Sequence, residues 1–518
     1  MAWTGMGNES SCSASNEDLN SNYCALDHCY SPVIIIGNGP SGIALSYLLS
    51  GHWPYYTGEP HPDPYLHARL LENREQSILQ QDLEFLCNGL EGRSHNPVAL
   101  LFDNLYQPNA DLVDDEKSRL EWRYDWARAV NHRVLGKGPP GGSWRDMDDS
   151  VRTLSQGRWM ELPGVNFSEW ITEYRERIGK QCDTSGSRAS LGDVGRYYKE
   201  YVESMGLEKS FRPYTEVTSV QRLKGRRVIN SESGEPEIQC QRCRKYEGHN
   251  LFEVKGHFLS DTMCCEKLVS ANDSFTVLTP NVILATGMIG IPNHLDVPGE
   301  DLPYVLYSVK DLEAAIQCED VHSNSDPILI VGSGLNAADA VLAAMSSGVP
   351  VVHAFRRSAF DKELIFSKLP KSVYPEYHRV HQMMQQCRLD ERAKDRSYTS
   401  LPQHTVHEFH PGRRVVIKGP EDCSSVRVSV AAVLIGSRPD LSFLPNDGMH
   451  LGVKEDGTPI SYQNNPIDVN PYTMETRAET GLYAMGPLVG DNFVRFAKGG
   501  ALAIASNIYK KMQAAVAM

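Results

Sequence analysis

Two glycine-rich turns of the same design lie far apart in the chain. The first reads GNGPSG (residues 37–42) and the second reads GSGLNA (residues 332–337). Each follows a short apolar run and precedes an amphipathic stretch, as when a buried parallel strand leads into a helix. Such small residues permit a tight turn, close approach of a pyrophosphate and helix–strand packing. We therefore predict two dinucleotide sites, one formed by Gly37, Gly39, Pro40, Ser41 and Gly42 and the other by Gly332, Gly334 and Ala337.

The second turn has a cationic pair at the position that selects between nicotinamide dinucleotides. The strand predicted over residues 349–355 ends directly before Arg356 and Arg357. An acidic residue there would hold a ribose diol, whereas arginine accommodates a 2′-phosphate. The sequence therefore favours NADPH over NADH at this site. The alternative is a pair of solvated arginines at a strand end.

The first turn is expected to meet two segments from later in the chain. NVILATG (residues 281–287) is predicted to be a buried strand that ends in a Thr-Gly turn. Residues 481–508 combine a short strand, a glycine-rich turn and a small-residue helix starting near Phe496. The N-terminus of that helix could face an anionic or electron-rich part of the same ligand. Convergence of such distant segments suggests a large flavin dinucleotide, FAD, contacted by Thr286, Gly287, Gly486 and Asp491.

The order of the motifs predicts the fold class and the domains. We expect an α/β protein with two Rossmann-like dinucleotide-binding domains, the NADPH domain being inserted into the FAD domain. A chain of 518 residues is also longer than one core usually supports. The expected parts are a disordered tail (1–31), the FAD domain (32–290 and 431–518) and the NADPH domain (291–430).

Two insertions interrupt the predicted FAD domain. Residues 51–131, which include the helical run DLEFLCNGLEGR, are expected to form a cap packed on this domain. Residues 221–276 are expected to form a β excursion before the strand at 281. In the NADPH domain, HQMMQQC (381–387) is predicted to be an amphipathic helix with Met as core filler, in preference to a metal or redox site.

The cysteines do not have the spacing of a typical metal site. Cys240 and Cys243 form a CxxC pair, and the adjacent Cys264 and Cys265 follow later. Adjacent cysteines fit a zinc knuckle poorly, so we predict no metal site and free thiols, with zinc as the alternative. Twelve cysteines without a secretory signal predict a reducing compartment, cytoplasmic or nuclear.

Charge and hydropathy exclude several classes of function. The 65 acidic and 51 basic residues give a net charge of −14, which argues against general nucleic-acid binding and docking on anionic membranes. The polar N-terminus lacks the apolar region of a signal peptide. The absence of an apolar run of 18 residues predicts a soluble protein without a transmembrane segment.

Most of the chain from residue 32 to about 508 resembles the two-dinucleotide flavoproteins, and among them the flavin-containing (class B) monooxygenases. The segment GRYYKEYVESMGLEKSFRPYTEVTSV (195–220) is similar to the helix and strand after their flavin loop. More narrowly, three long segments resemble the oxidative stress-induced growth inhibitor family. They are NGLEGRSHNPVALLFDNL, LPKSVYPEYHRVHQMM and AMGPLVGDNFVRFAKGGALA.

This resemblance implies a function and further site residues. It implies an FAD- and NADPH-dependent monooxygenase that uses O2 and a small-molecule substrate in the control of cell growth, death and cytokinesis. It also allows protein partners in growth control and a midbody or nuclear location. Gly141, Gly142 and Trp144 match the family's flavin turn, Val217 matches a backbone contact to adenine, and Gln156 is a candidate donor near the flavin.

The sequence departs from the family pattern at three places. Gly136 stands where an acidic residue holds the flavin's adenosine ribose; Asp103, expected to end an inserted strand, is either its substitute or an ordinary acid. Leu154 replaces an asparagine that supports oxygen activation. Tyr307 and Ser308 are what remains at the place where the family has a fingerprint of Phe-x-Gly and His. Cofactor binding is therefore better supported than hydroxylation.

No catalytic residue is firmly assigned, because the cofactor carries the difficult chemistry in such enzymes. Two alternatives to the monooxygenase remain open. One is an NADPH oxidase that releases peroxide without an oxygenated product. The other is a non-enzymatic growth-regulating scaffold that keeps the fold.

Overall fold

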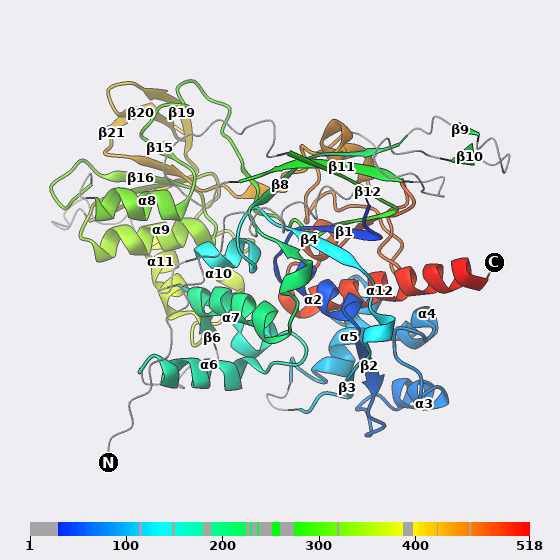
Figure 1. Ribbon diagram of the computed structural model, residues 1–518. Helices are drawn as coiled ribbons and strands as arrows, with labels where there is room; N and C mark the ends of the chain where they lie inside the picture. Colours follow the sequence, from blue (N-terminus) through cyan, green and yellow to red (C-terminus); the bar gives the residue numbers. More distant parts are fainter. Residues whose placement is uncertain are drawn as a thin grey trace, which may run out of the picture. The chain divides into compact units, whose positions relative to one another are not determined.

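The computed structural model of the chain divides into two compact units, which are described separately (Figure 1). Unit 1 comprises Met1–Met288 and Pro439–Met518, and unit 2 comprises Ile289–Arg438. The structure describes residues 30–112, 116–147, 151–179, 188–223, 228–229, 236–237, 251–259, 274–318, 321–386, 397–421, 423–454 and 457–517. The predicted tail up to residue 29 and the cysteine pairs at 240–243 and 264–265 lie outside these residues.

Unit 1 is built on a parallel sheet with β1 at its centre. Val33 of β1 lies level with Asn281 on one side and with His132 on the other. All four residues of β1 are buried, as expected for a parallel strand covered on both faces. The strand order is β24 (Leu482–Ala484), β13 (Asn281–Leu284), β1 (Val33–Ile36), β4 (His132–Leu135) and β7 (Phe211–Arg212).

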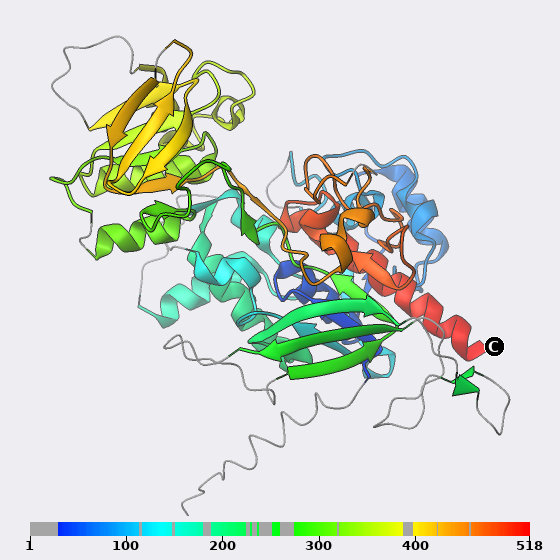
Figure 2. The same ribbon diagram turned by 90° about the horizontal axis from the view of Figure 1, so that it is seen from above.

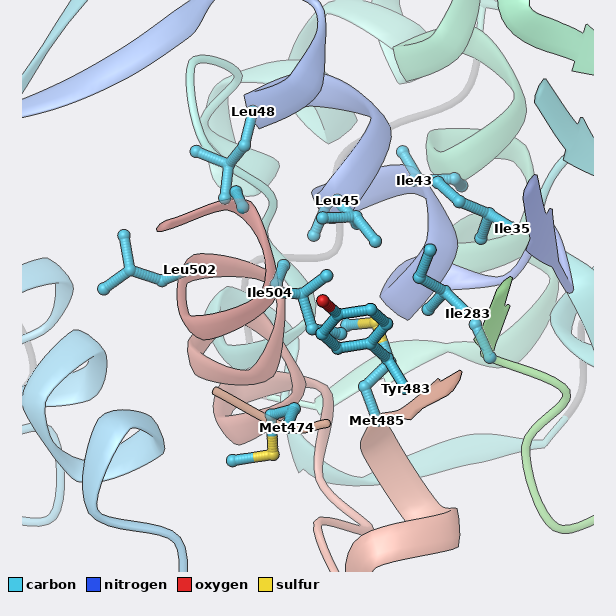
Figure 3. Packing of buried hydrophobic residues seen from close by; sticks show 14 of the residues in the cluster. Ile35, Ile43, Leu45, Leu48, Ile283, Met474, Tyr483, Met485, Leu502 and Ile504 are labelled. Carbon is cyan, nitrogen blue, oxygen red and sulfur yellow. The ribbon is translucent and has the colours of Figure 1, made fainter. Parts of the chain in front are cut away.

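Two helices far apart in sequence pack side by side in unit 1. Helix α2 (Pro40–Leu49) follows β1, and α12 (Val494–Ala517) packs along both α2 and α5 (Pro97–Tyr106). The bare Gly499 allows this approach, because a Cβ there would overlap the backbone of Ala99 on α5. The core between α2, α12 and the sheet is shown in Figure 3, with Ile35, Leu45, Ile283, Leu502 and Ile504 among its residues.

The inserted segment 51–131 shares the hydrophobic core of unit 1. Its strands β2 (His52–Tyr56) and β3 (Leu120–Tyr124) pair in antiparallel fashion. The predicted helical run at its centre is helical only in α4 (Leu83–Cys87), after α3 (Pro64–Glu72). The expectation that Asp103 ends a strand is wrong, because NPVALLFD forms helix α5 with Pro97 in its first turn, where proline is well tolerated.

The rest of unit 1 flanks this core. Figure 2 shows the three-stranded antiparallel sheet in green, formed by β8 (Thr215–Arg222), β11 (Phe252–Phe258) and β12 (Ser274–Thr279). The short strands β9 (Val228–Ile229) and β10 (Pro236–Glu237) pair separately. The remaining elements are β5 (Arg152–Gln156), α6 (Phe167–Arg177), β6 (Arg188–Ser190) and α7 (Leu191–Ser204).

Unit 2 repeats the parallel design. Its sheet has the order β15 (Val305–Leu306), β22 (Ala431–Val433), β16 (Ile328–Val331), β17 (Val351–Phe355) and β18 (Tyr398–Pro402). The unit extends beyond the boundary predicted at residue 430, because β22 pairs with β16 and β23 (Ser437–Arg438) pairs with β14 (Ile291–Pro292).

Helices and a second, antiparallel sheet complete unit 2. Met384 is buried on α11 (Pro375–Gln386), the segment expected to be amphipathic. The other helices are α8 (Val309–Gln317), α9 (Leu335–Ser346) and α10 (Ile365–Lys368). The antiparallel sheet consists of β19 (Thr405–His410), β20 (Arg414–Lys418) and β21 (Cys423–Arg427).

Candidate dinucleotide sites

The first glycine turn (residues 37–42) lies at the carboxyl edge of the unit 1 sheet. Gly37 has a φ of 114°, and a Cβ there would overlap the carbonyl oxygen of Ala285 after β13. Its N–H donates to the carbonyl of Leu135 at the end of β4, at 2.8 Å. A Cβ on Gly42 would overlap the carbonyl oxygen of Gly37. The turn is therefore held between three strand ends and has no room for side chains at these two positions.

Helix α2 begins at this turn with open hydrogen-bond donors. Gly39 is its N-cap residue and Pro40 occupies its first turn, and no side chain caps this end among the residues described. The nearest atom to a Cβ on Gly39 would be the Cα of Gly142, at 3.8 Å. The first N–H groups of α2 are therefore free to bind an anion, and the helix dipole favours a phosphate there.

The loop after β4 lies against the first glycine turn. Gly141 and Gly142 have φ values of 117° and 59°. The Gly141 N–H donates to the carbonyl of Asn38 at 2.9 Å, and a Cβ on Gly142 would lie 2.9 Å from the Cα of Gly39. The predicted pair of glycines is thus brought directly to the first glycine turn.

The two predicted pocket residues, Trp144 and Gln156, make contacts within unit 1 that do not involve the first glycine turn. The half-buried Trp144 packs on α7, with its ring centroid 6.1 Å from that of Tyr198. Gln156 is engaged within its own segment, where its Oε1 accepts a hydrogen bond from Nε of Arg158 at 2.8 Å. Leu154 lies half-buried on β5. No catalytic group emerges from these three residues.

Two later segments complete the first site. The buried Oγ1 of Thr286 has no hydrogen-bond partner among the described residues, and the adjacent Gly287 faces open space. A Cβ on Gly486, whose φ is 66°, would lie 2.6 Å from Oγ of Ser41. An unsatisfied buried hydroxyl is costly. Together with the uncapped helix, this hydroxyl fits a site built for a polar ligand such as a dinucleotide.

Asp491 follows this turn and is buried, with 3% exposure. Its N–H donates to the carbonyl of Gly486 at 3.1 Å. Its carboxylate accepts hydrogen bonds from Oγ of Ser94 and Nδ2 of Asn96, both at 2.6 Å. Burial raises the pKa of Asp491 to about 6, against the lowering effect of these two donors. No sequence pattern marks Ser94 and Asn96 as its partners.

Asp103 does not serve as the missing ribose acid. The residue is 7% exposed, and its carboxylate is bound by the guanidinium of Arg495, with Nη2 2.6 Å from Oδ2 and Nε 2.5 Å from Oδ1. Asp111 binds the same guanidinium through Nη1 at 2.9 Å. Asp103 is therefore a partner in a buried ion pair between α5 and α12.

Val217 lies on β8, which begins beside the loop that follows β4. Two residues before it, the N–H of Thr215 donates to the carbonyl of Gly136 at 2.9 Å. The Val217 side chain itself belongs to the hydrophobic core. The backbone contact to adenine remains a prediction.

The second glycine turn (residues 332–337) repeats the geometry in unit 2. Gly332 has a φ of 134°, and a Cβ there would overlap the carbonyl oxygen of Leu434 and lie 3.6 Å from Cβ of Ala337. Gly334 is the N-cap residue of α9. Within the described part of the chain, no side chain caps this helix and no atom lies within 4 Å of a Cβ on Gly334. This helix end can therefore also bind an anion.

The predicted cationic pair lies at the carboxyl edge of the same sheet. Arg356 and Arg357 are exposed directly after β17, the neighbour of β16. Nη1 of Arg357 lies 2.9 Å from Oδ2 of Asp361. Of the two, Arg356 is the better candidate for a 2′-phosphate, since the charge of Arg357 is already paired.

A buried histidine behind the second turn was missed from sequence. His353 on β17 is 0% exposed, and its Nε2 lies 2.6 Å from the carbonyl oxygen of Gly332. Its Nδ1 lies 2.7 Å from the hydroxyl of Tyr398. These partners fit a neutral ring that donates from Nε2 and accepts at Nδ1. Burial lowers the pKa of His353 to about 4.

Tyr307 and Ser308 have structural roles in unit 2. The hydroxyl of Tyr307 donates to the carbonyl of Glu300 at 3.1 Å. Oγ of Ser308 accepts from the N–H of Asp311 at 3.0 Å and so caps α8. Neither contact supplies a group for oxygen chemistry.

Two parallel sheets, each with a glycine turn at its carboxyl edge, define the fold class of flavoprotein oxidoreductases with two Rossmann-like domains. Similar solved structures include the bacillithiol disulfide reductase Bdr from Bacillus cereus, at a TM-score of 0.54 and 15% identity over 93% of this chain and 99% of the other. Another is ornithine hydroxylase from Pseudomonas aeruginosa, at a TM-score of 0.53 and 11% identity over 93% and 100%. Residues 266–486 match the model of the pyridine nucleotide-disulphide oxidoreductase family.

A longer similarity identifies the particular family. The chain is 46% identical to oxidative stress-induced growth inhibitor 1 of Mus musculus over 93% of this chain and 95% of the mouse protein. The chain belongs to the oxidative stress-induced growth inhibitor family. In the part that the structure describes, none of the helices has the length and apolar character needed to cross a membrane.

Proposed function

We propose that this chain is an oxidoreductase that binds FAD in unit 1 and NADPH in unit 2, and that it acts as a monooxygenase on a small-molecule substrate with O2. The observation that carries the proposal is the meeting of distant segments at the first glycine turn. There, among the residues that the structure describes, no side chain caps α2 and no group pairs with the hydroxyl of Thr286, so both can bind a polar ligand. Geometry of this kind suits a dinucleotide that spans a sheet edge.

The chain's own residues bind and orient the cofactors. The N–H groups at the start of α2 would hold the FAD pyrophosphate, and the hydroxyl of Thr286 would donate to the same ligand. In unit 2, the start of α9 would hold the NADPH pyrophosphate and Arg356 its 2′-phosphate. When bound, FAD supplies the redox chemistry between NADPH and O2.

The experiment that tests this proposal has two stages. The protein is purified after incubation with FAD, and its absorbance spectrum is recorded together with the flavin released on heating. The proposal expects bound flavin, and a colourless protein contradicts it. NADPH and O2 consumption are then compared with the yields of oxygenated product and of peroxide.

A second candidate function is an NADPH oxidase that releases peroxide. It is favoured by Leu154, which offers only an apolar side chain at the position where the resemblance to class B monooxygenases implies an asparagine. Stoichiometric peroxide per NADPH, with no oxygenated product across candidate soft nucleophiles and carbonyls, would favour this function over the monooxygenase.

The name of the mouse relative also motivates a proposed role in restraining growth. We propose that this chain acts in the cytoplasm and that the role depends on bound FAD. A Gly39→Trp variant, which would fill the space before α2, is compared with the wild type in a proliferation assay. Loss of growth restraint is expected. Full restraint by a variant that binds no FAD would instead support a scaffold without enzymatic activity.

A further inference from the structure

Asp491 has a buried carboxylate, and its backbone is bound to the segment that lies against the first glycine turn. Its N–H is hydrogen-bonded to Gly486, and Gly486 lies against Ser41 in the first turn of α2. A carboxylate has about four lone-pair sites, and the two donors from Ser94 and Asn96 use only part of this capacity. Asp491 can therefore accept further hydrogen bonds, and a ligand hydroxyl at this edge would supply them.

Both donors to Asp491 come from the inserted segment. Ser94 and Asn96 are each 8% exposed. Asn96 is the N-cap residue of α5, where asparagine ordinarily accepts a hydrogen bond from the helix, but its side chain makes no such cap. Its Nδ2 donates instead to Oδ2 of Asp491 at 2.6 Å and to the carbonyl of Val489 at 3.3 Å. The Asn96 amide therefore binds the segment that carries Asp491, and it does not cap its own helix among the described residues.

Ser94 completes the arrangement from the other side. Its Oγ donates to Oδ1 of Asp491 at 2.6 Å and accepts from the backbone N–H of Asn96 at 3.0 Å. Each carboxylate oxygen therefore has one donor. Since hydrogen bonds to a charged acceptor are strong and directional, the two donors fix the plane of the carboxylate.

We propose that Ser94 and Asn96 are positioning residues for the first dinucleotide: they hold the Asp491 carboxylate in the orientation in which it accepts hydrogen bonds from the hydroxyl groups of FAD. These two residues of the inserted segment would thereby take part in cofactor binding through Asp491. The inference rests on the proposed function, because it needs FAD as the ligand of unit 1.

The test measures FAD affinity in Ser94→Ala and Asn96→Ala by titrating the full-length apoprotein. Each substitution is expected to weaken FAD binding about tenfold, as expected for loss of a hydrogen bond to a charged group. The matched control is Asn104→Ala, because the Asn104 amide donates to Leu100 within α5. The control is expected to bind FAD like the wild type.

Exchanging the two side chains distinguishes two roles for Asn96: orienting the carboxylate that binds the ligand, or only packing in the fold. The double variant Asn96→Asp/Asp491→Asn keeps a hydrogen bond between the two positions but moves the carboxylate away from the ligand. It is expected to match the thermal midpoint of wild-type apoprotein while losing FAD affinity at least tenfold. A merely structural role would restore both.

The outcomes are distinguishable. A wild type that binds FAD, with Asn96→Ala and the exchanged variant binding it equally well, overturns this inference and leaves the proposed function intact. A wild type that binds no FAD overturns the proposed function and the inference with it. Weaker FAD binding in both alanine variants, with an unaffected control, supports the inference.

Discussion

The carboxamide of Asn38 fills the space that a side chain on Gly136 would need, since a Cβ on Gly136 would overlap its Nδ2 and Cγ. Nδ2 of Asn38 donates to the carbonyl groups of Gly138, at 2.6 Å, and Pro139, at 3.1 Å. Asn38 thus fastens the loop after β4 to the first glycine turn. A side chain at this position, including the acid that the family resemblance implies, would therefore have to displace the Asn38 amide.

Restoring that acid should harm the protein. Gly136→Asp would displace the buried Asn38 amide, and overpacking of this kind costs about 1–3 kcal/mol. We expect a lower free energy of unfolding in urea and no gain in FAD affinity. Gly412→Asp is the control, because the Cβ position of Gly412 is open. A Gly136→Asp variant that is as stable as the wild type and binds FAD more tightly would contradict this explanation.

The unpaired hydroxyl of Thr286 predicts opposite effects on stability and binding. Thr286→Val keeps the shape of the side chain and removes a buried group that has no partner among the described residues. The apoprotein should be at least as stable as the wild type, because no internal hydrogen bond is lost. FAD affinity, measured by fluorescence titration, should fall several-fold. An apoprotein destabilised by this change, with unaltered FAD binding, would refute the role of the hydroxyl.

The buried pair of Asp103 and Arg495 should stabilise the fold. Asp103→Asn removes one of the two carboxylates that bind the guanidinium of Arg495, while Asp111 remains as its partner. We expect a loss above about 1 kcal/mol but below the about 3–5 kcal/mol of a buried pair that is broken completely. Urea unfolding should show this loss. Arg427→Met, which removes an exposed pair with Asp326, should change stability by less than about 1 kcal/mol. Equal effects of the two variants would show that burial does not strengthen the inner pair.

His353 predicts a pH dependence of stability. Its folded pKa of about 4 lies below the ordinary value of 6.5, so protonation favours the unfolded chain. Its contribution is complete above pH 6.5 and is lost as the pH falls toward 4. The loss at pH 5 is about 2 kcal/mol. Urea unfolding of wild type and His353→Gln at pH 7 and pH 5 checks this. The variant should lose less stability than the wild type between the two pH values; an identical loss would contradict the prediction.

The local parts of this structure could be predicted from the sequence. The apolar runs ending at Ile36 and Val331, the glycine spacing after them and the amphipathic stretches beyond are signals within single segments. The run around Asp103 was misassigned because a short apolar stretch fits a strand or a helix equally well. Pro97 at its start was the available sign of a helix.

The contacts between distant segments could not be predicted. Asp491 and Ser94 are separated by 397 positions, and no local pattern marks either as the partner of the other. Arg495 and Asp103 pair across a similar separation. His353 has no sequence signal beyond a single histidine in an apolar strand. These groups are brought together only by tertiary packing.

The central claim is that unit 1 binds FAD and unit 2 binds the NADPH that reduces it. The most direct measurement is an anaerobic NADPH titration of the FAD-loaded protein, followed by flavin absorbance, in the wild type and in Gly334→Leu. The wild type should hold FAD and lose its oxidised flavin absorbance with stoichiometric NADPH. Gly334→Leu should hold FAD equally well but remain oxidised at the same NADPH concentration. A wild type without flavin, a flavin that NADPH does not reduce, or equal reduction in the variant would contradict the claim.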